Sequence, residues 1–244
     1  MSTLLFYGKP VVLNKETHKN LKVKPAAGDF SFARKTNSVI LAGVEFAEAA
    51  KEYPIVFAAT ANDKIVPVAL LGLRNEENLY VDEDGKWDAK YIPAFVRRYP
   101  FVLAEGNKPS ELAVCIDEDY AGFQEDEGES LFNEDGTNSP MLDKALKFLG
   151  EYQQQYSLTE KFIEALKELD LFQTLNARID LTDGRKFALS NFMVIDEKKL
   201  LGLKQKDAFN LFKEGKLAWV YAHLISLSNM SRMLNRIPAE EAAA

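Results

Sequence analysis

The sequence has few of the residues that build metal sites, disulfides and membrane spans. Its 244 residues include one cysteine and two histidines. One cysteine excludes an intramolecular disulfide and any Cys-x-x-Cys metal motif, and two histidines form no histidine-rich ligand set. No stretch reaches the ~18 consecutive apolar residues of a transmembrane helix. We therefore expect a soluble protein with no metal, no cofactor and no transmembrane segment, which excludes a permease.

The sequence also lacks the marks of secretion. The first residues, MSTLLFYGKPVVLNKE, contain neither the basic segment nor the long apolar segment of a Sec signal peptide. Cys115 has no partner and lies in the apolar run LAVCI, so we interpret it as a buried structural residue. Both observations favour a cytoplasmic location, with export by a non-Sec route as the alternative.

Nucleic acid and nucleotides are poor candidates for a partner. The formal net charge is −7, which argues against a dominant surface for nucleic acid. Neither GxxxxGK[ST] nor GxGxxG occurs, so no phosphate-binding loop is predicted. The chain is 47% hydrophobic and 27% charged, which is typical of a globular protein.

Positive charge is missing altogether from residues 109–143, which hold 11 Asp and Glu residues and no Lys, Arg or His. Residues 118–138 of this part are predicted to form a long acidic loop, mobile near 124–130 and anchored by Tyr120, Phe123 and the Leu131–Phe132 pair. Calcium binding is a weaker alternative. Asp82-x-Asp84-Gly85 and Asn133-x-Asp135-Gly136 resemble calcium loops but lack the glutamate expected at position 12.

The first 117 residues are predicted to be rich in strands. Short apolar runs bounded by Gly, Pro, Asn or Asp occur at 10–14, 38–43, 54–59, 65–73, 78–82, 101–105 and 112–117. Residues 44–53 have helix-forming residues and are followed by Pro54, so they predict a short helix. Several runs are apolar on both faces, as in a sheet that is covered on both sides.

Residues 139–237 are predicted to contain helices and one hairpin. Ser139-Pro140 starts a helix, and Ser157 to Glu160 fits a capping box that starts a second one. Residues 176–196 alternate around Asp183-Gly184, which predicts a β-hairpin. Three helices follow at 196–203, 206–215 and 216–237, with Gly215 ending the middle one, and residues 238–244 are expected to fray. The whole chain is thus predicted to be a single α+β domain, with a mixed sheet covered by the C-terminal helices.

The best candidate for a site is GKWDAKYIPAFVRRYPF, residues 85–101. Asp84-Gly85 predicts a tight turn, and Tyr91, Phe95 and Tyr99 recur every four residues, as on one stripe of a short helix. Arg97 or Arg98 could hold a small anion or a peptide carboxylate, with Trp87 and the tyrosines supplying aromatic rings. The alternative is that the arginine pair binds the acidic loop.

His223 lies in the apolar run WVYAHLISL. It is a candidate general acid or base, but we favour a buried or half-buried helix histidine that forms one hydrogen bond. No G-x-S-x-G motif accompanies it.

Four segments together resemble the SapC-like family of bacterial proteins: residues 85–101, the CID run at 115–117, SLFNEDG and GKLAWVYAHLISLSN. The resemblance covers about Pro10 to Asn235. It brings no catalytic residues, and Trp87, Tyr91, Arg97, Arg98, Tyr99 and Pro100 are only the positions that match.

The resemblance implies a non-enzymatic binding or accessory protein of a bacterial surface-layer or peptide-related system. Its partner would be a small anionic ligand, a peptide or another protein. One alternative is an enzyme acting on a small anionic or peptide substrate, with Arg97 or Arg98 as anchor and His223 as acid or base. Another is a self-assembling surface-array subunit, which would be a homo-oligomer.

Overall fold

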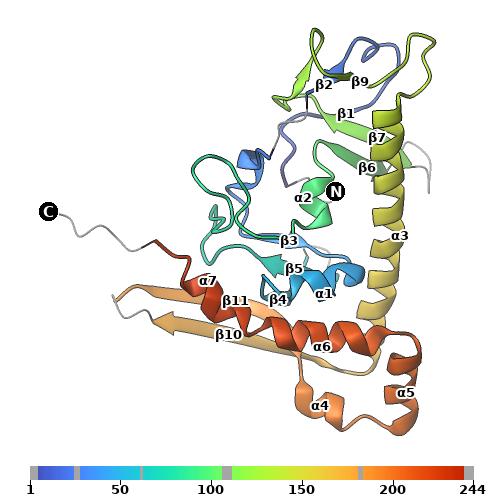
Figure 1. Cartoon of the computed structure of the whole chain (residues 1–244). Helices are drawn as coiled ribbons and strands as arrows, with labels where there is room; N and C mark the ends of the chain where they lie inside the picture. The colour runs from blue at the N-terminus through green and yellow to red at the C-terminus, as the bar shows by residue number, and fades with distance from the viewer. Residues whose placement is uncertain (1–4, 25–27, 61–62, 106–111, 181–183, 239–244) are drawn as a thin grey trace, which may run out of the picture.

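The computed structural model describes residues 5–24, 28–60, 63–105, 112–180 and 184–238 (Figure 1). It has an α+β fold, which confirms the predicted class. The strands do not form one mixed sheet, however. They are divided among three sheets in which every pair of neighbours is antiparallel. Short connections such as the one between β4 and β5 favour antiparallel pairing, because parallel pairing needs a long crossover.

The largest sheet joins the two halves of the chain. Its order is β10-β11-β4-β5-β3, with bounds Phe172–Asp180, Lys186–Ile195, Ile55–Ala59, Ile65–Leu70 and Ser38–Ile40. The predicted C-terminal hairpin is confirmed as β10 and β11, although Asp183 of its turn lies outside the described residues. Buried residues follow one another in β4 and β5, as expected for strands covered on both faces.

The two smaller sheets lie at the other end of the molecule (Figure 1). One has the order β1-β7-β6, with bounds Pro10–Val12, Leu112–Asp117 and Phe101–Glu105. The other has the order β8-β2-β9, with bounds Phe123–Gln124, Lys22–Val23 and Glu129–Ser130. The strand expected at 78–82 is absent from the described structure. Only an isolated bridge between Val81 and Trp87 flanks the turn, in which Gly85 has φ 81° as predicted.

Short helices precede the long one. They are η1 (Ser31–Ala33), η2 (Gly43–Glu45), α1 (Phe46–Ala49) and α2 (Ala94–Arg97). The helix α3 (Pro140–Glu168) starts as predicted, since the Ser139 side chain accepts a hydrogen bond from the main-chain N–H of Leu142 at 3.2 Å.

The second helix start that we expected at Ser157 is wrong, because α3 continues through Ser157 without a break and has 29 residues in all. The hydroxyl of Thr159 donates to the carbonyl of Gln155 and accepts from the N–H of Gly43 at 2.8 Å. It therefore caps the distant turn η2 and does not begin a helix of its own.

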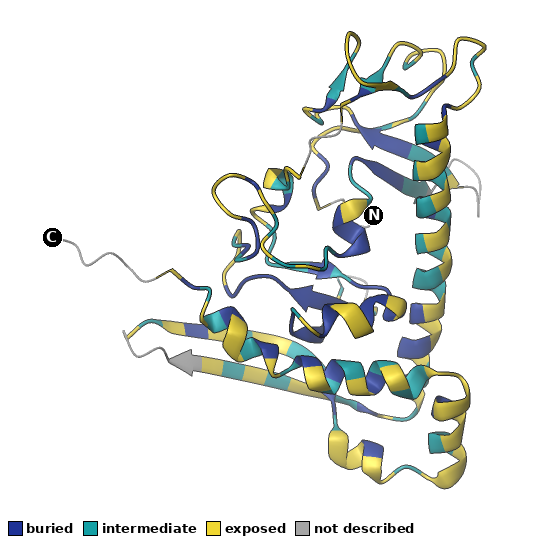
Figure 2. Cartoon of the chain, in the orientation of Figure 1, coloured by how far each residue is buried: buried dark blue, intermediate teal, exposed yellow. Residues whose placement is uncertain are grey.

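Helix α3 connects two apolar cores. Leu142 and Leu149 near its start pack with Phe101, Ile116 and Leu131. The buried residues near its end, Phe162, Ile163 and Leu166, belong to the larger core around the five-stranded sheet. Figure 2 shows α3 along one side of both parts of the molecule.

The C-terminal helices are α4 (Glu197–Leu201), α5 (Gln205–Lys213), α6 (Lys216–Ser226) and α7 (Asn229–Leu234). Gly215 has φ 72° and separates α5 from α6, as the sequence predicted. α6 packs on β4 and β11, and this confirms helices over the main sheet. The tail expected to fray lies outside the described residues from 239 onward.

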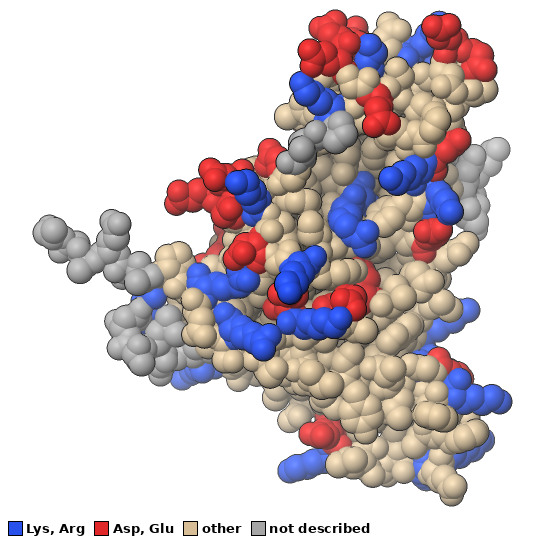
Figure 3. All heavy atoms as spheres, in the orientation of Figure 1, with Lys and Arg blue, Asp and Glu red and all other residues tan. Residues whose placement is uncertain are grey.

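The acidic segment is more ordered than a plain loop. It contributes β8 and β9, which flank β2, and its predicted anchors Leu131 and Phe132 are buried. Figure 3 shows acidic side chains gathered at this end of the molecule, with basic ones between them. Lys9 pairs with Glu118 at 2.6 Å and Lys24 with Glu127 at 2.8 Å, so lysines supply the counter-ions.

Within the described ranges, no helix combines the length and the apolar character that crossing a bilayer requires.

Candidate functional site

The helix in the Gly85–Phe101 stretch is shorter than predicted. α2 has four residues, and Pro93 precedes it with an extended backbone, φ −53° and ψ 141°. Proline disfavours the helical conformation in the residue before it, so Tyr91 and Ile92 lie outside the helix. The predicted stripe of Tyr91, Phe95 and Tyr99 is therefore not a continuous helical stripe.

Trp87 and Tyr91 have structural partners. The indole N–H of Trp87 donates to the hydroxyl of Tyr53 at 2.8 Å, and that hydroxyl donates to the carbonyl of Tyr91. The Tyr91 hydroxyl donates to buried Glu45 at 2.7 Å. Burial and the Glu45 carboxylate raise the pKa of Tyr91, which keeps this phenol neutral. These contacts use the polar atoms of both side chains within the fold.

Tyr99 is held in a similar way. Its hydroxyl donates to Asp117 at 2.9 Å, and its ring stacks on Phe32 with centroids 4.1 Å apart. Asp117 is buried and also accepts from the main-chain N–H groups of Lys9 and Gly8, at 2.7 and 3.1 Å. Asp117 thus fixes the N-terminal segment and Tyr99 to β7.

The two arginines differ in exposure and in their contacts. Arg97 is exposed, and its Nε atom donates to the carbonyl of Ile92 at 2.9 Å. Its guanidinium lies 5.2 Å from the ring of Phe148 on α3 and 5.9 Å from that of Tyr91. Its Nε atom therefore has an acceptor, and its guanidinium lies near two aromatic rings at the surface.

Arg98 is half-buried, and its guanidinium interacts with the Tyr7 side chain. Its guanidinium lies 3.9 Å from the ring centre of Phe95 and 5.6 Å from that of Tyr152 on α3. Its Nε atom is buried and has no hydrogen-bond partner. In the described part of the chain no carboxylate forms an ion pair with either arginine, so the expected pairing with the acidic loop is wrong.

Three tyrosines surround the charge of Arg98. Burial raises the pKa of Tyr7 to about 12, and the nearby guanidinium opposes this rise. Burial also raises the pKa values of Tyr152 and Tyr156, and Arg98 again opposes it. All three phenols are therefore neutral O–H groups near pH 7.

Tyr152 and Tyr156 are neighbours on α3, with rings stacked 6.2 Å apart at 18°. Neither hydroxyl has a hydrogen-bond partner among the described residues, whereas the Tyr7 hydroxyl donates to the carbonyl of Phe101 at 2.8 Å. We call Arg98, Tyr152 and Tyr156 the Arg98 cluster. Its hydroxyls and guanidinium are hydrogen-bond donors suited to an anion.

Tyr7, Tyr152 and Tyr156 were not among the site residues predicted from the sequence. Tyr152 follows Leu149 by three residues, so helical spacing places it with the apolar core residues of the helix that begins at Ser139. The four-residue spacing of Tyr152 and Tyr156, which places both on one helix face, was the available signal.

His223 is not part of this cluster. It is fully buried on α6, as we favoured, but forms two hydrogen bonds, not one. Its Nδ1 donates to the carbonyl of Ile55 at 2.9 Å, and its Nε2 accepts from the N–H of Ile195 at 3.1 Å. Burial lowers its pKa to about 4. With both ring nitrogens bound to the main chain of two strands, it has no atom free for acid or base chemistry.

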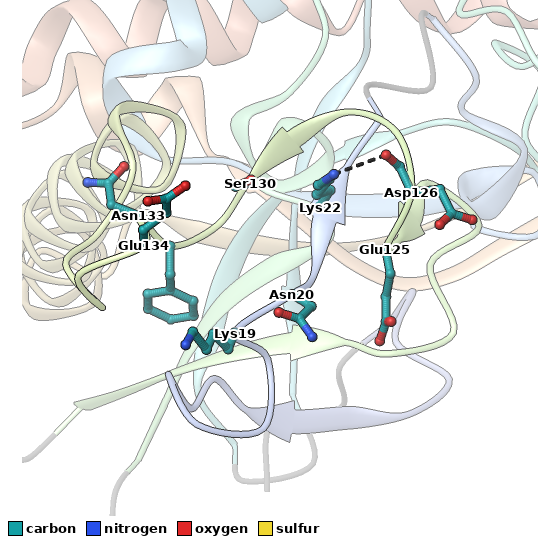
Figure 4. Close-up of a pocket in the computed structure, with 9 residues that line it drawn as sticks. Lys19, Asn20, Lys22, Glu125, Asp126, Ser130, Asn133 and Glu134 are labelled. Atoms are coloured by element: carbon teal, nitrogen blue, oxygen red, sulfur yellow. Dashed lines mark hydrogen bonds between the residues drawn. The ribbon is translucent and has the colours of Figure 1, made fainter.

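A shallow pocket of about 360 Å³ lies on the acidic segment (Figure 4). Its lining mixes charges of both signs, including Lys19, Lys22, Glu125 and Glu134. The Lys22 ammonium points to the carbonyl of Asp126 and donates to it at 3.0 Å. The positive and negative side chains of the lining therefore largely offset one another, and the pocket does not favour a ligand of either charge.

The two calcium-like fragments are ordinary turns. Asp82 accepts from the N–H of Lys86 at 2.8 Å, and Asp135 accepts from the N–H and the hydroxyl of Thr137 at 2.9 and 2.6 Å. Over the ranges that the structure covers, no three His, Cys, Asp or Glu side chains are grouped so as to hold a metal ion. Cys115 is buried in β7, as expected, and burial raises the pKa of its thiol.

The fold and the site define an α+β protein with a half-buried arginine between two cores. The SapC family model matches residues 13–233, so the chain belongs to the SapC family. No curated protein and no solved structure matches the chain.

Proposed function

We propose that the chain is a non-catalytic binding or accessory protein that holds an anionic group at the Arg98 cluster. The observation that carries this proposal is the half-buried guanidinium of Arg98, whose buried Nε has no hydrogen-bond partner. A buried donor without a partner is costly, and an unpaired charge is more so. A bound anion next to the guanidinium would supply the counter-charge that Arg98 lacks among the described residues.

The chemistry of the cluster suits an oxyanion such as a carboxylate. A guanidinium presents parallel N–H groups that match the two oxygens of a carboxylate or of a phosphate. Tyr152 and Tyr156 add neutral hydroxyl donors, since burial keeps their pKa values raised. The Arg98 guanidinium stacks on the ring of Phe95, and this contact orients the guanidinium without using its N–H groups.

The position of the cluster in the fold supports the same proposal. Tyr152 and Tyr156 lie on α3 between the residues that enter the smaller core and those that enter the larger one. Binding sites occur preferentially where two packed units meet. A ligand here would contact α2 and the middle of α3 together.

Family membership gives the biological frame of the proposal. We infer a role in a bacterial surface-layer or peptide-related system, in which the anionic group would be a peptide carboxylate. A cytoplasmic location is part of this proposal, because an unpaired buried thiol such as Cys115 suits a reducing compartment. Cell fractionation that finds the protein mainly outside the inner membrane would contradict that part.

The test is a binding titration with short alanine peptides, one set with a free C-terminal carboxylate and one set amidated. The parent protein should bind the free-acid peptides more tightly. Arg98→Lys keeps the charge but loses the planar fork, and it should weaken binding about tenfold or more. Arg97→Lys is the matched control, since Arg97 is exposed and has its own acceptor, and it should bind like the parent.

Equal binding of the two peptide sets, or unchanged binding by Arg98→Lys, would overturn the proposal. Arg98 would then act only as a cation–π contact between α2 and Tyr152 of α3. Thermal melts of all three proteins separate a loss of binding from a loss of folding.

A further inference from the structure

Helix α3 carries a line of side chains that leads from the Arg98 cluster to an exposed carboxylate. Tyr152, Tyr156 and Glu160 follow one another at four-residue spacing, so they are neighbours on one side of the helix. The two tyrosines are half-buried, whereas the side chain of Glu160 is 49% exposed. We call Tyr152, Tyr156 and Glu160 the α3 ridge. It leads from the half-buried guanidinium of Arg98 to the surface of the molecule.

The two ends of the α3 ridge carry opposite charges. The Arg98 guanidinium lies 5.6 Å from the ring centre of Tyr152, and the carboxylate of Glu160 is at the other end. Both charges act on Tyr156 between them, because burial and the Glu160 carboxylate raise the pKa of its phenol and the Arg98 guanidinium opposes this rise. A short peptide with free ends has the complementary charges, an anionic carboxylate at one end and a cationic ammonium group at the other.

The length of the α3 ridge limits the length of such a peptide. Glu160 follows Tyr152 by eight positions. At ~1.5 Å per residue, their Cα atoms are about 12 Å apart along the helix. An extended chain advances by about 3.3–3.6 Å per residue, so a tripeptide or a tetrapeptide spans roughly 10–14 Å. A peptide of that length can place its two charged ends at Arg98 and Glu160.

Among the described carboxylates near the α3 ridge, Glu160 is the one available to an ammonium group. Burial and, to a smaller extent, Glu45 raise the pKa of Tyr152. Glu45 is itself buried, however, and it accepts hydrogen bonds from the Tyr91 hydroxyl and from two main-chain N–H groups. Glu160 has only a long ion pair of 3.8 Å with Lys64, whose side chain is 72% exposed. Such an exposed pair contributes little, so a ligand ammonium group can replace Lys64 at small cost.

We propose that the Arg98 cluster and Glu160 together bind a free tripeptide or tetrapeptide, with its carboxylate at Arg98 and its α-ammonium group at Glu160. This inference rests on the proposed function, which assigns only the carboxylate end of the ligand. Glu160 is then a specificity-determining residue. It favours peptides with a free amino end over N-acylated peptides, and it favours short peptides over longer ones, whose amino end lies beyond it.

The experiment is calorimetric titration with alanine peptides that have a free carboxylate and either a free or an N-acetylated amino end. The parent should bind the free tripeptide and tetrapeptide about threefold to fivefold more tightly than their acetylated forms, as expected for one exposed ion pair. Glu160→Gln should remove this difference and bind the acetylated peptides like the parent. Glu164→Gln is the matched control, because Glu164 lies one turn further along α3 and pairs with Lys167 at 3.2 Å, and it should keep the difference.

Replacing Lys64 tests the same contact from the other side. Lys64→Gln removes the ammonium group that lies beside Glu160, so the preference for a free amino end should increase by about twofold or more. Thermal melts of all these variants should match that of the parent, because the replaced side chains are exposed. The melts therefore separate a lost ligand contact from a loss of folding.

Equal binding of free and acetylated peptides by the parent would overturn the inference. So would a Glu160→Gln variant that keeps the preference for a free amino end. If the peptide carboxylate is required but the amino end is not, the proposed function stands and the assignment of Glu160 fails. No binding of any of these peptides would overturn both.

Discussion

Replacing His223 with glutamine should remove most of the loss of stability that the protein shows between about pH 7 and about pH 5. In the folded chain Nδ1 donates to Ile55 and Nε2 accepts from the N–H of Ile195. A proton on Nε2 would face another donor, so protonation would break that bond. Burial adds a second cost to the charged form.

The sign and size of the effect follow from linkage. The pKa of His223 is about 4 in the folded chain, against 6.5 for an unperturbed histidine. Between these values the unfolded chain binds a proton that the folded chain does not, so stability is complete above pH 6.5 and is lost as the pH falls toward 4. From about pH 7 to about pH 5 the loss is about 2 kcal/mol.

The assay is urea unfolding of the parent and of His223→Gln at both pH values. The variant is destabilised at neutral pH as well, by about 1–3 kcal/mol, because one strand N–H or carbonyl loses its partner. The informative quantity is the difference between the two pH values. His18, the other histidine, is present in both proteins and cancels. Equal losses of stability in parent and variant would refute the assignment of His223 as a neutral, buried structural residue.

Two further predictions concern packing and hydrogen bonding, and both are read from thermal or denaturant unfolding. Gly43→Ala should cost about 1–3 kcal/mol, because a Cβ atom there would lie 2.4 Å from the ring of Trp219. In contrast, a Cβ added at Gly150 in α3 would have no atom within 4 Å, so Gly150→Ala should stabilise the protein by up to about 1 kcal/mol. Equal melting temperatures for the two variants would contradict this packing. Asp117→Asn should lower the free energy of unfolding by about 1–3 kcal/mol. The reason is that an amide cannot accept all the hydrogen bonds that Tyr99 and two main-chain N–H groups donate to the carboxylate. An unchanged unfolding midpoint would show that these bonds contribute little.

Local features of the fold could be predicted from the sequence. The N-cap at Ser139, the turn at Gly85 and the end of α5 at Gly215 depend on the conformational preferences of one or two residues. Alternating apolar residues likewise predicted the hairpin of β10 and β11. Such signals act within a few residues, and at these three positions no distant contact overrides them.

Features that depend on distant partners could not be predicted. The pattern at Ser157 to Glu160 is a valid capping box, but the N–H of Gly43, 116 residues away, recruits the Thr159 hydroxyl and the helix continues. The division of the strands into three sheets likewise depends on which runs meet in space. A local pattern does not contain that information.

The candidate site, too, could be predicted only in part from the sequence. The sequence identified the stretch with two arginines but could not choose between them. Arg97 and Arg98 differ because of what α3 places beside them, Phe148 in one case and Tyr152 in the other. Helix α3 begins more than 40 positions later, after the acidic segment. The pairing of arginines with that segment was plausible from charge alone, but nearby lysines fill that role.

Calorimetric titration of the parent, Arg98→Lys and Arg97→Lys with free-acid and amidated alanine peptides decides whether Arg98 holds an anion. We predict that the parent and Arg97→Lys bind the free-acid peptides alike, and that Arg98→Lys binds them about tenfold more weakly or worse. Amidation should abolish the preference in all three. Binding that is equal across the three proteins, or that does not depend on the carboxylate, would contradict an anion site at Arg98.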